Sequence, residues 1–423
     1  MEEPGAGQGA RARCCTFVHV LIHLYPFLPS LLCVKTIHDT TQSLEQARSH
    51  PAARRATRLI FLVSGIGMSA WAPMVPYARA RLGLDEAQLG LALLAFGGGS
   101  MISMPFVGWL AHRLGNRTLI VASGLLMCVA LPVLALASTP LALVATLFYF
   151  GVMLGAVDVA MNAHAVDVER LDGGRLMSGF HGLFSIGGLS GAAVMSGLLA
   201  VGVPLAVAAG GVAVVLVALV LWLRSGLLDD GPTAVSAERG EFGMPHALAW
   251  VLGLMCFASF LAEGAMLDWS AVFLRDFRGV AAASAGFGYA CFSVAMATGR
   301  LTGDRLIARF GPVWAVRVGA ALAVCGFLLV AWVPSVEMAL GGFVLIGLGA
   351  SNIVPVMFSA AGRLPGTPPA IAIATATTLG YAGLLSGPAL IGFVAHASSL
   401  PVAFAAVAGL LVLVALSARI VQR

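Results

Sequence analysis

From Arg58 onward, apolar blocks of about 20 residues alternate with short polar connections. An α-helix needs about 20 apolar residues to cross the hydrocarbon core of a membrane. The pattern therefore predicts twelve spanning helices, at roughly 58–78, 87–110, 117–138, 141–165, 177–200, 203–223, 247–273, 283–302, 313–333, 337–361, 370–394 and 399–419. One connection, SGLLDDGPTAVSAERGEFGMP at 225–245, is long and polar, and it divides the helices six and six.

Composition supports a membrane protein. The chain is 59% hydrophobic and 10% charged, with a mean hydropathy of +0.95, whereas a soluble domain carries roughly 25% charged residues. The net charge of +5 is spread over single arginines without an aromatic-basic stripe, so we expect no nucleic-acid partner. The seven cysteines include no CxxC spacing, so neither a metal site nor a disulfide framework is predicted, and no cofactor is implied.

Arginine placement predicts the orientation, because cytoplasmic loops carry an excess of Arg and Lys. It puts both termini and the central connection in the cytoplasm. One predicted side carries Arg54, Arg55, Arg58, Arg113, Arg117, Arg170, Arg175, Arg224, Arg239, Arg300, Arg305, Arg309, Arg317, Arg363, Arg419 and Arg423; the other carries Arg79, Arg81, Arg275 and Arg278.

Residues 1–55 differ from the rest, with the only lysine, Lys35, and four of the nine histidines. Their run CCTFVHVLIHLYPFLPSLLCV (14–34) is apolar, but no small-residue cleavage site clearly follows it. We interpret this N-terminal leader as poorly ordered or as a start-site artefact. An interfacial segment and a thirteenth span are the alternatives.

The two predicted halves repeat each other at a spacing of 191–196 residues. The matched segments are LGAVD (154–158) with LGASN (348–352), LSG (189–191) with LSG (385–387), and GWLAHRLGNR (108–117) with GRLTGDRLIARFGP (299–312). We therefore predict an all-α membrane protein with a six-helix bundle at 56–224, a cytoplasmic linker at 225–245 and a second bundle at 246–423, related by pseudo-two-fold symmetry.

These features resemble the major facilitator superfamily (MFS). Its Gly-x-Leu-Ala-Asp-Arg-x-Gly-Arg-like signature between helices 2 and 3 is matched at Gly108, Leu110, Ala111, Arg113, Gly115 and Arg117. His112 stands where the family has Asp, and Asn116 where it has the next Arg. The second copy keeps the acid, as Gly303, Asp304 and Arg305. The resemblance implies that both copies form a cytoplasmic gate, with a weaker latch in the first half.

Further runs are similar to the MosC/YbjJ-like branch of bacterial inner-membrane proteins: DVAMNAHAVDVE (158–169), MSGFHGLFSIGG (177–188), EGAMLDWSAVFL (263–274) and FGYACFSVAMATGRLTGDRL (287–306). The similarity covers about residues 56–420. It implies secondary transport across the bacterial inner membrane, and it favours small polyol or sugar-like solutes.

Helix 4 carries the first candidate site. Asp158 lies about 25 Å along that helix, at 1.5 Å per residue, and Asn162 follows one turn later on the same face. A carboxylate within the hydrocarbon region costs several kcal/mol unless it faces a cavity or a partner. Asp158 is thus either a substrate or proton site supported by Asn162, or a packing acid.

His164 points about 120° away and is interpreted as a boundary residue. The gate or surface charges are Asp167, Glu169, Arg170 and Arg175.

Other polar residues within the spans complete the candidate set. Antiparallel pairing of helices 4 and 5 places His181 level with Asn162, as a proton relay or a packing histidine. Glu263 lies near the middle of helix 7 and Asp268 in its outer third, five residues apart and so on different faces. Asn352 is the repeat mate of Asp158. Trp71 in helix 1 either lines a sugar-like site or belongs to an interface belt.

These residues predict a secondary transporter that moves a small solute by alternating access. No Walker-type ATP loop occurs, so an ion gradient is the expected energy source, with a proton or another ion as partner. We expect a monomer in the lipid bilayer. The alternatives are an efflux pump for amphipathic compounds and a non-transporting sensor. Catalysis is not expected, because the histidines and acids are scattered rather than clustered at one interface.

Overall fold

The computed structural model describes residues 50–84, 86–228, 247–280 and 287–422, and in these ranges the chain forms helices joined by short connections. The leader expectation falls almost wholly outside them, as does most of the linker. The first helix begins at Pro51, a few residues inside the segment assigned to the leader.

The first bundle contains α3 (Pro51–Ala70), the 3-10 turn η1 (Ala72–Met74), α4 (Val75–Leu82), α5 (Glu86–Leu114), α6 (Asn116–Leu136), α7 (Pro140–Asp172), α8 (Met177–Ala200) and α9 (Leu205–Leu223). The second contains α10 (Ala247–Arg278), α11 (Phe287–Phe310), α12 (Pro312–Trp332), α13 (Val336–Ala350), α14 (Ile353–Ala361), α15 (Pro369–Ala397) and α16 (Leu400–Ser417). Segments α3–η1–α4 form one interrupted rod, and α13–α14 form another, so the described ranges hold twelve rods in two groups of six.

Eleven of these rods are long and apolar enough to cross a membrane. The twelfth is α11, whose 24 residues would span about 36 Å at 1.5 Å per residue. It carries Arg300, Asp304, Arg305 and Arg309. These four charged residues explain the low hydropathy of α11, which is long enough to cross the membrane with the other eleven rods. The predicted twelve-helix fold is therefore confirmed.

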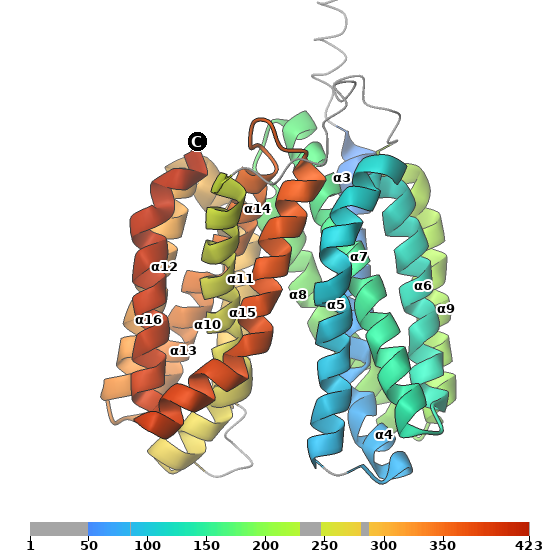
Figure 1. Ribbon diagram of the computed structural model, residues 1–423, viewed down its shortest axis with the longest axis horizontal. Helices are drawn as coiled ribbons and strands as arrows, with labels where there is room; N and C mark the ends of the chain where they lie inside the picture. Colours follow the sequence, from blue (N-terminus) through green and yellow to red (C-terminus); the bar gives the residue numbers. More distant parts are fainter. Residues whose placement is uncertain (1–49, 85, 229–246, 281–286, 423) are drawn as a thin grey trace, which may run out of the picture. The chain divides into compact units, whose positions relative to one another are not determined.

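Packing within each bundle follows one plan. In the first bundle α3 packs on α8, α5 on α7, and α6 on α9; in the second α10 packs on α15, α11 on α13, and α12 on α16. If the twelve rods are numbered 1 to 12 along the chain, the first bundle pairs rods 1–5, 2–4 and 3–6. The second bundle repeats these pairs as 7–11, 8–10 and 9–12. The bundles meet through α5 against α15 and α8 against α11, which the same two-fold relation exchanges (Figure 1).

Repeated glycines permit this packing. A Cβ on Gly187 would lie 2.2 Å from the carbonyl oxygen of Leu62 in α3, and a Cβ on its mate Gly383 would lie 2.3 Å from that of Phe257 in α10. Because apolar side chains gain little by leaving lipid, close backbone approach is a main source of helix association in membranes.

The second rod break differs from the predicted continuous span at 337–361. Helix α13 ends at Ala350 and α14 begins at Ile353. A helical carbonyl at Ser351 would accept the N–H four residues later, but that residue is Pro355, which has no N–H. The carbonyl of Ser351 is thereby free for another donor.

The rods define two ends of the molecule. The end of the molecule where α9 finishes and α10 begins is called the linker end, and the opposite end is called the distal end. Helix α3 also begins at the linker end, and α16 finishes there. In Figure 1, where the linker end is uppermost, α5 and α15 approach each other there and diverge toward the distal end. The contact between the bundles is therefore tightest near the linker end.

Candidate functional site

A run of polar side chains crosses the boundary between the bundles, and it starts on α7. Asn162 donates from Nδ2 to the backbone oxygen of Asp158 at 2.9 Å, and its Nδ2 lies 3.4 Å from Oδ1 of the same aspartate. On α8, His181 approaches Asn162, with 3.1 Å between Nε2 and Oδ1. Because Oδ1 is an acceptor, Nε2 carries the proton. His181 thus lies level with Asn162, as antiparallel pairing of the two helices predicts.

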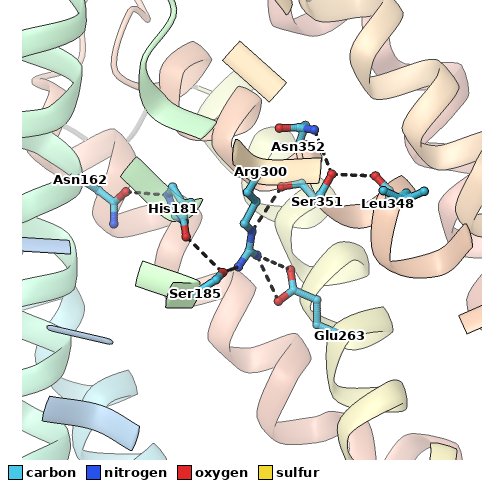
Figure 2. Close-up of polar contacts among 8 residues, drawn as sticks. All are labelled: Asn162, His181, Ser185, Glu263, Arg300, Leu348, Ser351 and Asn352. Carbon is cyan, nitrogen blue, oxygen red and sulfur yellow. Dashed lines mark hydrogen bonds and ion pairs between the residues drawn. The ribbon is translucent and has the colours of Figure 1, made fainter. Parts of the chain in front are cut away.

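The run continues into the second bundle through Arg300 of α11 (Figure 2). Ser185, one turn after His181, donates its hydroxyl to the backbone oxygen of His181 at 3.2 Å. Arg300 donates from Nη1 to Ser185 Oγ at 3.0 Å and from Nη2 to the two carboxylate oxygens of Glu263 at 3.2 and 3.4 Å. The guanidinium therefore joins α8, α10 and α11.

Arg300 also satisfies the helix break. Its Nε lies 3.4 Å from the free carbonyl oxygen of Ser351. Asn352 donates from Nδ2 to the backbone oxygen of Gly299 at 3.0 Å and to Ser351 Oγ at 2.9 Å, which fixes the break against α11 (Figure 2). Asn352 is the repeat mate of Asp158, but its contacts are with the backbone and with Ser351.

The two central acids have different partners. Glu263 shares an ion pair with Arg300, whereas Asp158 has no cationic side chain within ion-pair distance among the described residues and is held by Asn162. Tyr381 on α15 lies within electrostatic range of both acids, and its ring packs on Phe260 at 5.8 Å between centroids. Asp158 of the first bundle and Glu263 of the second therefore both lie near Tyr381.

Two predicted residues lie away from this run. Trp71 follows α3, is 6% exposed, and its buried Nε1 has no hydrogen-bond partner in the described structure. It is a core residue here. Asp268 is exposed on α10 and lies within electrostatic range of Tyr289, as do Glu263 and Arg300.

Arg300, counted among the arginines of the predicted cytoplasmic side, lies inside the protein. The residue is 7% exposed and paired with Glu263, whose side chain is 18% exposed. Arginine was assigned to a side by its charge and its position near the end of an apolar block, but the helix continues for ten residues beyond it, to Phe310.

A second polar cluster closes the linker end, and it surrounds the N-terminus of α8. Glu169 of α7 accepts the backbone N–H groups of Leu176 and Met177 at 2.9 and 3.0 Å. Asp304 of α11 accepts those of Ser178 and Gly179 at 2.9 and 2.8 Å. The first N–H groups of a helix have no partner within it and carry partial positive charge, so carboxylates stabilise them.

Further contacts cross between the bundles beside this cap. Arg363, after α14, pairs with Glu169 at 2.5 Å, and Arg170 donates to the backbone oxygen of Gly362. Arg175 lies 4.0 Å from Glu169; burial lowers its pKa, and the neighbouring Arg363 lowers it further. The cavity enclosed among these groups measures only about 10 Å³, roughly the room of one water. We call this cluster of Glu169, Asp304, Arg363, Arg170 and the α8 amides the lock.

The second copy of the repeated motif is part of the lock, and the first is not. In the first copy Gly108 packs tightly on α15, where a Cβ would lie 2.6 Å from that of Ala374. Helix α15 begins at Pro369 and is preceded by Pro368, and neither proline offers an N–H to a capping acid. The sequence has His112 where the second copy has Asp304.

The other motif residues have local roles. Gly115, at φ 86°, precedes α6, and its repeat mate Gly311, at φ 85°, precedes α12; this region of φ favours glycine. Arg113 stacks on Trp109, with its guanidinium carbon 4.3 Å from the ring centroid. Gly303 lies against the helix break, since a Cβ there would fall 1.8 Å from Asn352 Oδ1. The rest of the motif is Arg117 and the exposed Arg305.

Two predicted residues near the linker end are buried. Glu169, predicted as a gate or surface charge, is 1% exposed beneath the start of α8, so it is not a surface charge. His164, interpreted as a boundary residue, is buried between α3 and the segment after α9. Its Nε2 accepts the N–H of Leu228 at 3.0 Å, so Nδ1 carries the proton and donates to Thr57 Oγ1 at 3.2 Å.

The comparison with known families decides the identity. A model of the Major Facilitator Superfamily matches residues 59–367, which is most of the chain. The chain belongs to the major facilitator superfamily. It is accordingly a multi-pass membrane protein of a transporter family, as the sequence resemblance implied.

Full-length relatives lie within this superfamily. An uncharacterized MFS-type transporter of Yersinia pestis is 46% identical over 374 residues, covering 87% of this chain and 95% of that protein. An uncharacterized transporter of Sinorhizobium fredii is 34% identical over 86% of this chain and 96% of its own. The membrane protein MosC of Rhizobium meliloti is 29% identical over 80% and 83%, so the resemblance to the MosC-like branch is confirmed.

Solved MFS structures share the fold. The E. coli fucose:proton symporter FucP, in an outward conformation, gives a TM-score of 0.73 at 18% identity and covers 89% of this chain and 100% of its own. The proton:xylose symporter XylE gives 0.71 at 13% identity, with 87% and 95% covered.

Sequence reasoning did not single out Ser185 and did not predict the contacts of Arg300. One signal was present. Aligning LAHR (110–113) with TGDR (302–305) places Arg300 opposite Gly108. A large cation at a position where the repeat mate needs a glycine for close packing indicates a specific contact.

Proposed function

We propose that this MFS protein is a secondary active transporter that moves a small polar solute by alternating access, coupled to a proton. The observation that carries the proposal is the pairing of two features. A lock closes the linker end, and of the two central acids Asp158 and Glu263 only Glu263 has an arginine partner among the described residues.

Asp158 is the proton-binding residue in this proposal. Burying a carboxylate without a cation costs several kcal/mol, and a bound proton removes that cost. Its neighbours Asn162 and Tyr381 provide hydrogen-bonding and aromatic surface. FucP and XylE are named as proton symporters of fucose and xylose, which supports a proton as the coupling ion and a sugar- or polyol-like solute.

The proposed location is the bacterial inner membrane, with the linker end and both termini in the cytoplasm. The arginine count supports this orientation even after Arg300 is removed from it. The lock then shuts the cytoplasmic side, and the divergence of α5 and α15 faces the periplasm (Figure 1).

The test begins with a thermal-shift screen of the purified protein against sugars, polyols and amines. Any hit is then measured for uptake into proteoliposomes under an imposed pH gradient. Accumulation that follows the gradient supports the proposal. A hit that binds but never crosses supports the sensor alternative.

Direction is tested in the same system. Counterflow of the hit in right-side-out and inverted vesicles distinguishes uptake from efflux. If the solute accumulates only in inverted vesicles, and against an opposed proton gradient, the protein is an exporter and the symport proposal is replaced.

A further inference from the structure

The outer helices of the second bundle carry an uncompensated positive surface at the linker end. The sequence has no Asp or Glu in residues 305–336 or 400–423. Exposed arginines lie in the last two turns of α11, near the start of α12 and in the 3-10 turn η4 (Ala418–Gln422), which packs on α12. They are Arg305, Arg309, Arg317 and Arg419.

Two stacked aromatic rings join α11 to α12 within this surface. The guanidinium carbon of Arg309 lies 5.3 Å from the ring centroid of Phe310, and that ring lies 4.6 Å from the ring of Trp314. Both rings are exposed, at 47% and 38%. Trp314 and Arg317 are three residues apart on α12 and therefore share a face. The aromatic pair thus connects the face of Arg309 to that of Arg317, and we call these four residues the arginine–tryptophan patch.

Arg317 lies on the side of α12 that faces lipid. Helix α12 spans Pro312–Trp332, so Arg317 is about 7.5 Å inside a helix whose length matches the hydrocarbon core. A guanidinium at this depth is costly unless its long side chain reaches an anion or water at the interface. The exposed residues of α12 recur every three or four positions along one stripe: Trp314, Arg317, Ala321, Cys325, Leu328 and Trp332.

The patch has no protein anion to neutralise it. Among the described residues no carboxylate forms an ion pair with Arg305, Arg309 or Arg317, and Asp304 caps the α8 amides instead. Arg305 and Arg309 are four residues apart on one face of α11, where like charges repel each other. A bound anion would relieve this repulsion. In a bilayer, the anion at the depth of these side chains is a lipid phosphate.

We propose that the arginine–tryptophan patch binds the headgroup of an anionic phospholipid in the leaflet at the linker end. Arg309 and Arg317 donate to the phosphate oxygens, because a guanidinium presents a planar fork that matches a phosphate. Phe310 holds the Arg309 guanidinium, and Trp314 lies at the interfacial level where tryptophan is enriched. The acyl chains lie along the lipid-facing stripe of α12. This site is apart from the solute and the coupling ion, and it goes beyond the proposed function.

The experiment is native mass spectrometry of the full chain released from nanodiscs that contain phosphatidylcholine and phosphatidylglycerol in equal amounts. The first headgroup is neutral and the second is anionic. The wild-type protein should retain phosphatidylglycerol in about tenfold excess, because each arginine near the surface favours an anionic lipid. In Arg309→Gln/Arg317→Gln the excess should fall to about threefold or less. No preference in the wild-type protein, or an undiminished one in this variant, would overturn the proposal.

Arg55→Gln/Arg224→Gln is the matched control. Both arginines are exposed at the linker end of the first bundle, so this variant loses the same charge at the same end of the molecule. It should keep the wild-type excess to within about twofold. An equal fall in the two double variants would show a general attraction to the positive end, and that result would overturn the site.

Two variants that keep the charge test the geometry of the patch. Trp314→Leu removes one ring, and Arg309→Lys replaces the planar guanidinium. Each should lower the excess about threefold, whereas attraction by charge alone would leave both unchanged and would overturn the proposal. These side chains are exposed, so the melting temperature should stay near that of the wild-type protein.

Inorganic phosphate tests the source of the anion. At millimolar concentration it should leave the bound phosphatidylglycerol in place, because the acyl chains add contacts that a free phosphate lacks. Displacement of the lipid would mean that the site takes a free phosphate, and the lipid proposal would be overturned.

Lipid binding and transport are measured separately. Among the described residues no hydrogen bond or ion pair joins Arg309 or Arg317 to the lock, so binding here is distinct from closure of the linker end. A protein that prefers the anionic lipid but moves no solute would end the transporter proposal alone. Proton-coupled uptake by a protein without this preference would end this inference alone.

Discussion

Glu169 and Asp304 belong to different bundles, yet they share four consecutive backbone amides at the start of α8, two each. Only Asp304 has to release its amides when the bundles separate, because Glu169 sits on α7 in the same bundle as α8. The inter-bundle part of the cap is therefore a single carboxylate, supplemented by Arg363 and Arg170.

Asp304→Asn should weaken the lock. Losing the charged acceptor at a helix N-terminus costs about 1–2 kcal/mol, a factor of roughly 5–30 in the open population. Ser359 lines the lock cavity and is buried, so Ser359→Cys, in a background with the seven native cysteines replaced, serves as a maleimide reporter. Labelling should rise by that factor. Asp276→Asn, which alters an exposed pair at the distal end, should leave it unchanged, and equal labelling in both would refute the capping role.

Glu169→Gln should open the lock more than Arg363→Gln does. Arg363 is partly exposed, so its ion pair is worth about 1 kcal/mol or less. Glu169 is buried and also accepts two amides, so its loss costs about 2–4 kcal/mol. The same maleimide reporter ranks the two variants, with Arg309→Gln, whose guanidinium lies over the exposed Phe310, as the control. The reverse order would mean that the ion pair, and not the cap, dominates.

The twelve rods and their two-fold relation were predictable because hydropathy and helix length are local properties. The contact between Asn162 and His181 was predictable too, since consecutive antiparallel helices place their facing ends level. These predictions need only the period of a helix and the thickness of a membrane.

The rest depends on which face of a helix a residue occupies and on what lies opposite. Arg300 was counted with the arginines of the cytoplasmic side because a count of charges ignores the helix face, and only the packing of α10 and α8 on α11 reveals its partners. Glu169 was predicted as a gate or surface charge, but only the connection to α8, which folds back over it, shows that it is buried. The break in α13–α14 had a sequence signal in Pro355, but the donor that compensates for it is Arg300, 51 residues before Ser351.

Gly187→Ala should destabilise the protein, whereas Gly188→Ala should not. A Cβ at Gly187 would lie 2.2 Å from the backbone oxygen of Leu62, which cannot move without shifting α3, and one at Gly188 meets nothing within 4 Å. We expect a loss of about 1–3 kcal/mol at Gly187 from overpacking and a gain of up to about 1 kcal/mol at Gly188 from helix propensity. Thermal unfolding in nanodiscs measures both; similar melting temperatures for the pair would contradict the close approach of α8 and α3.

Asp158→Asn should separate solute movement from proton coupling. Asparagine keeps the size and a hydrogen bond toward Asn162 but cannot bind a proton, so in the proposed mechanism it stands in for the protonated acid. Counterflow of a solute hit in proteoliposomes should therefore persist, while accumulation driven by a pH gradient should fall by about tenfold or more. Asp276→Asn, at an exposed distal position, should retain both activities. If Asp158→Asn still accumulates solute with the gradient, the coupling proton binds elsewhere, and Glu263 becomes the carboxylate to test next.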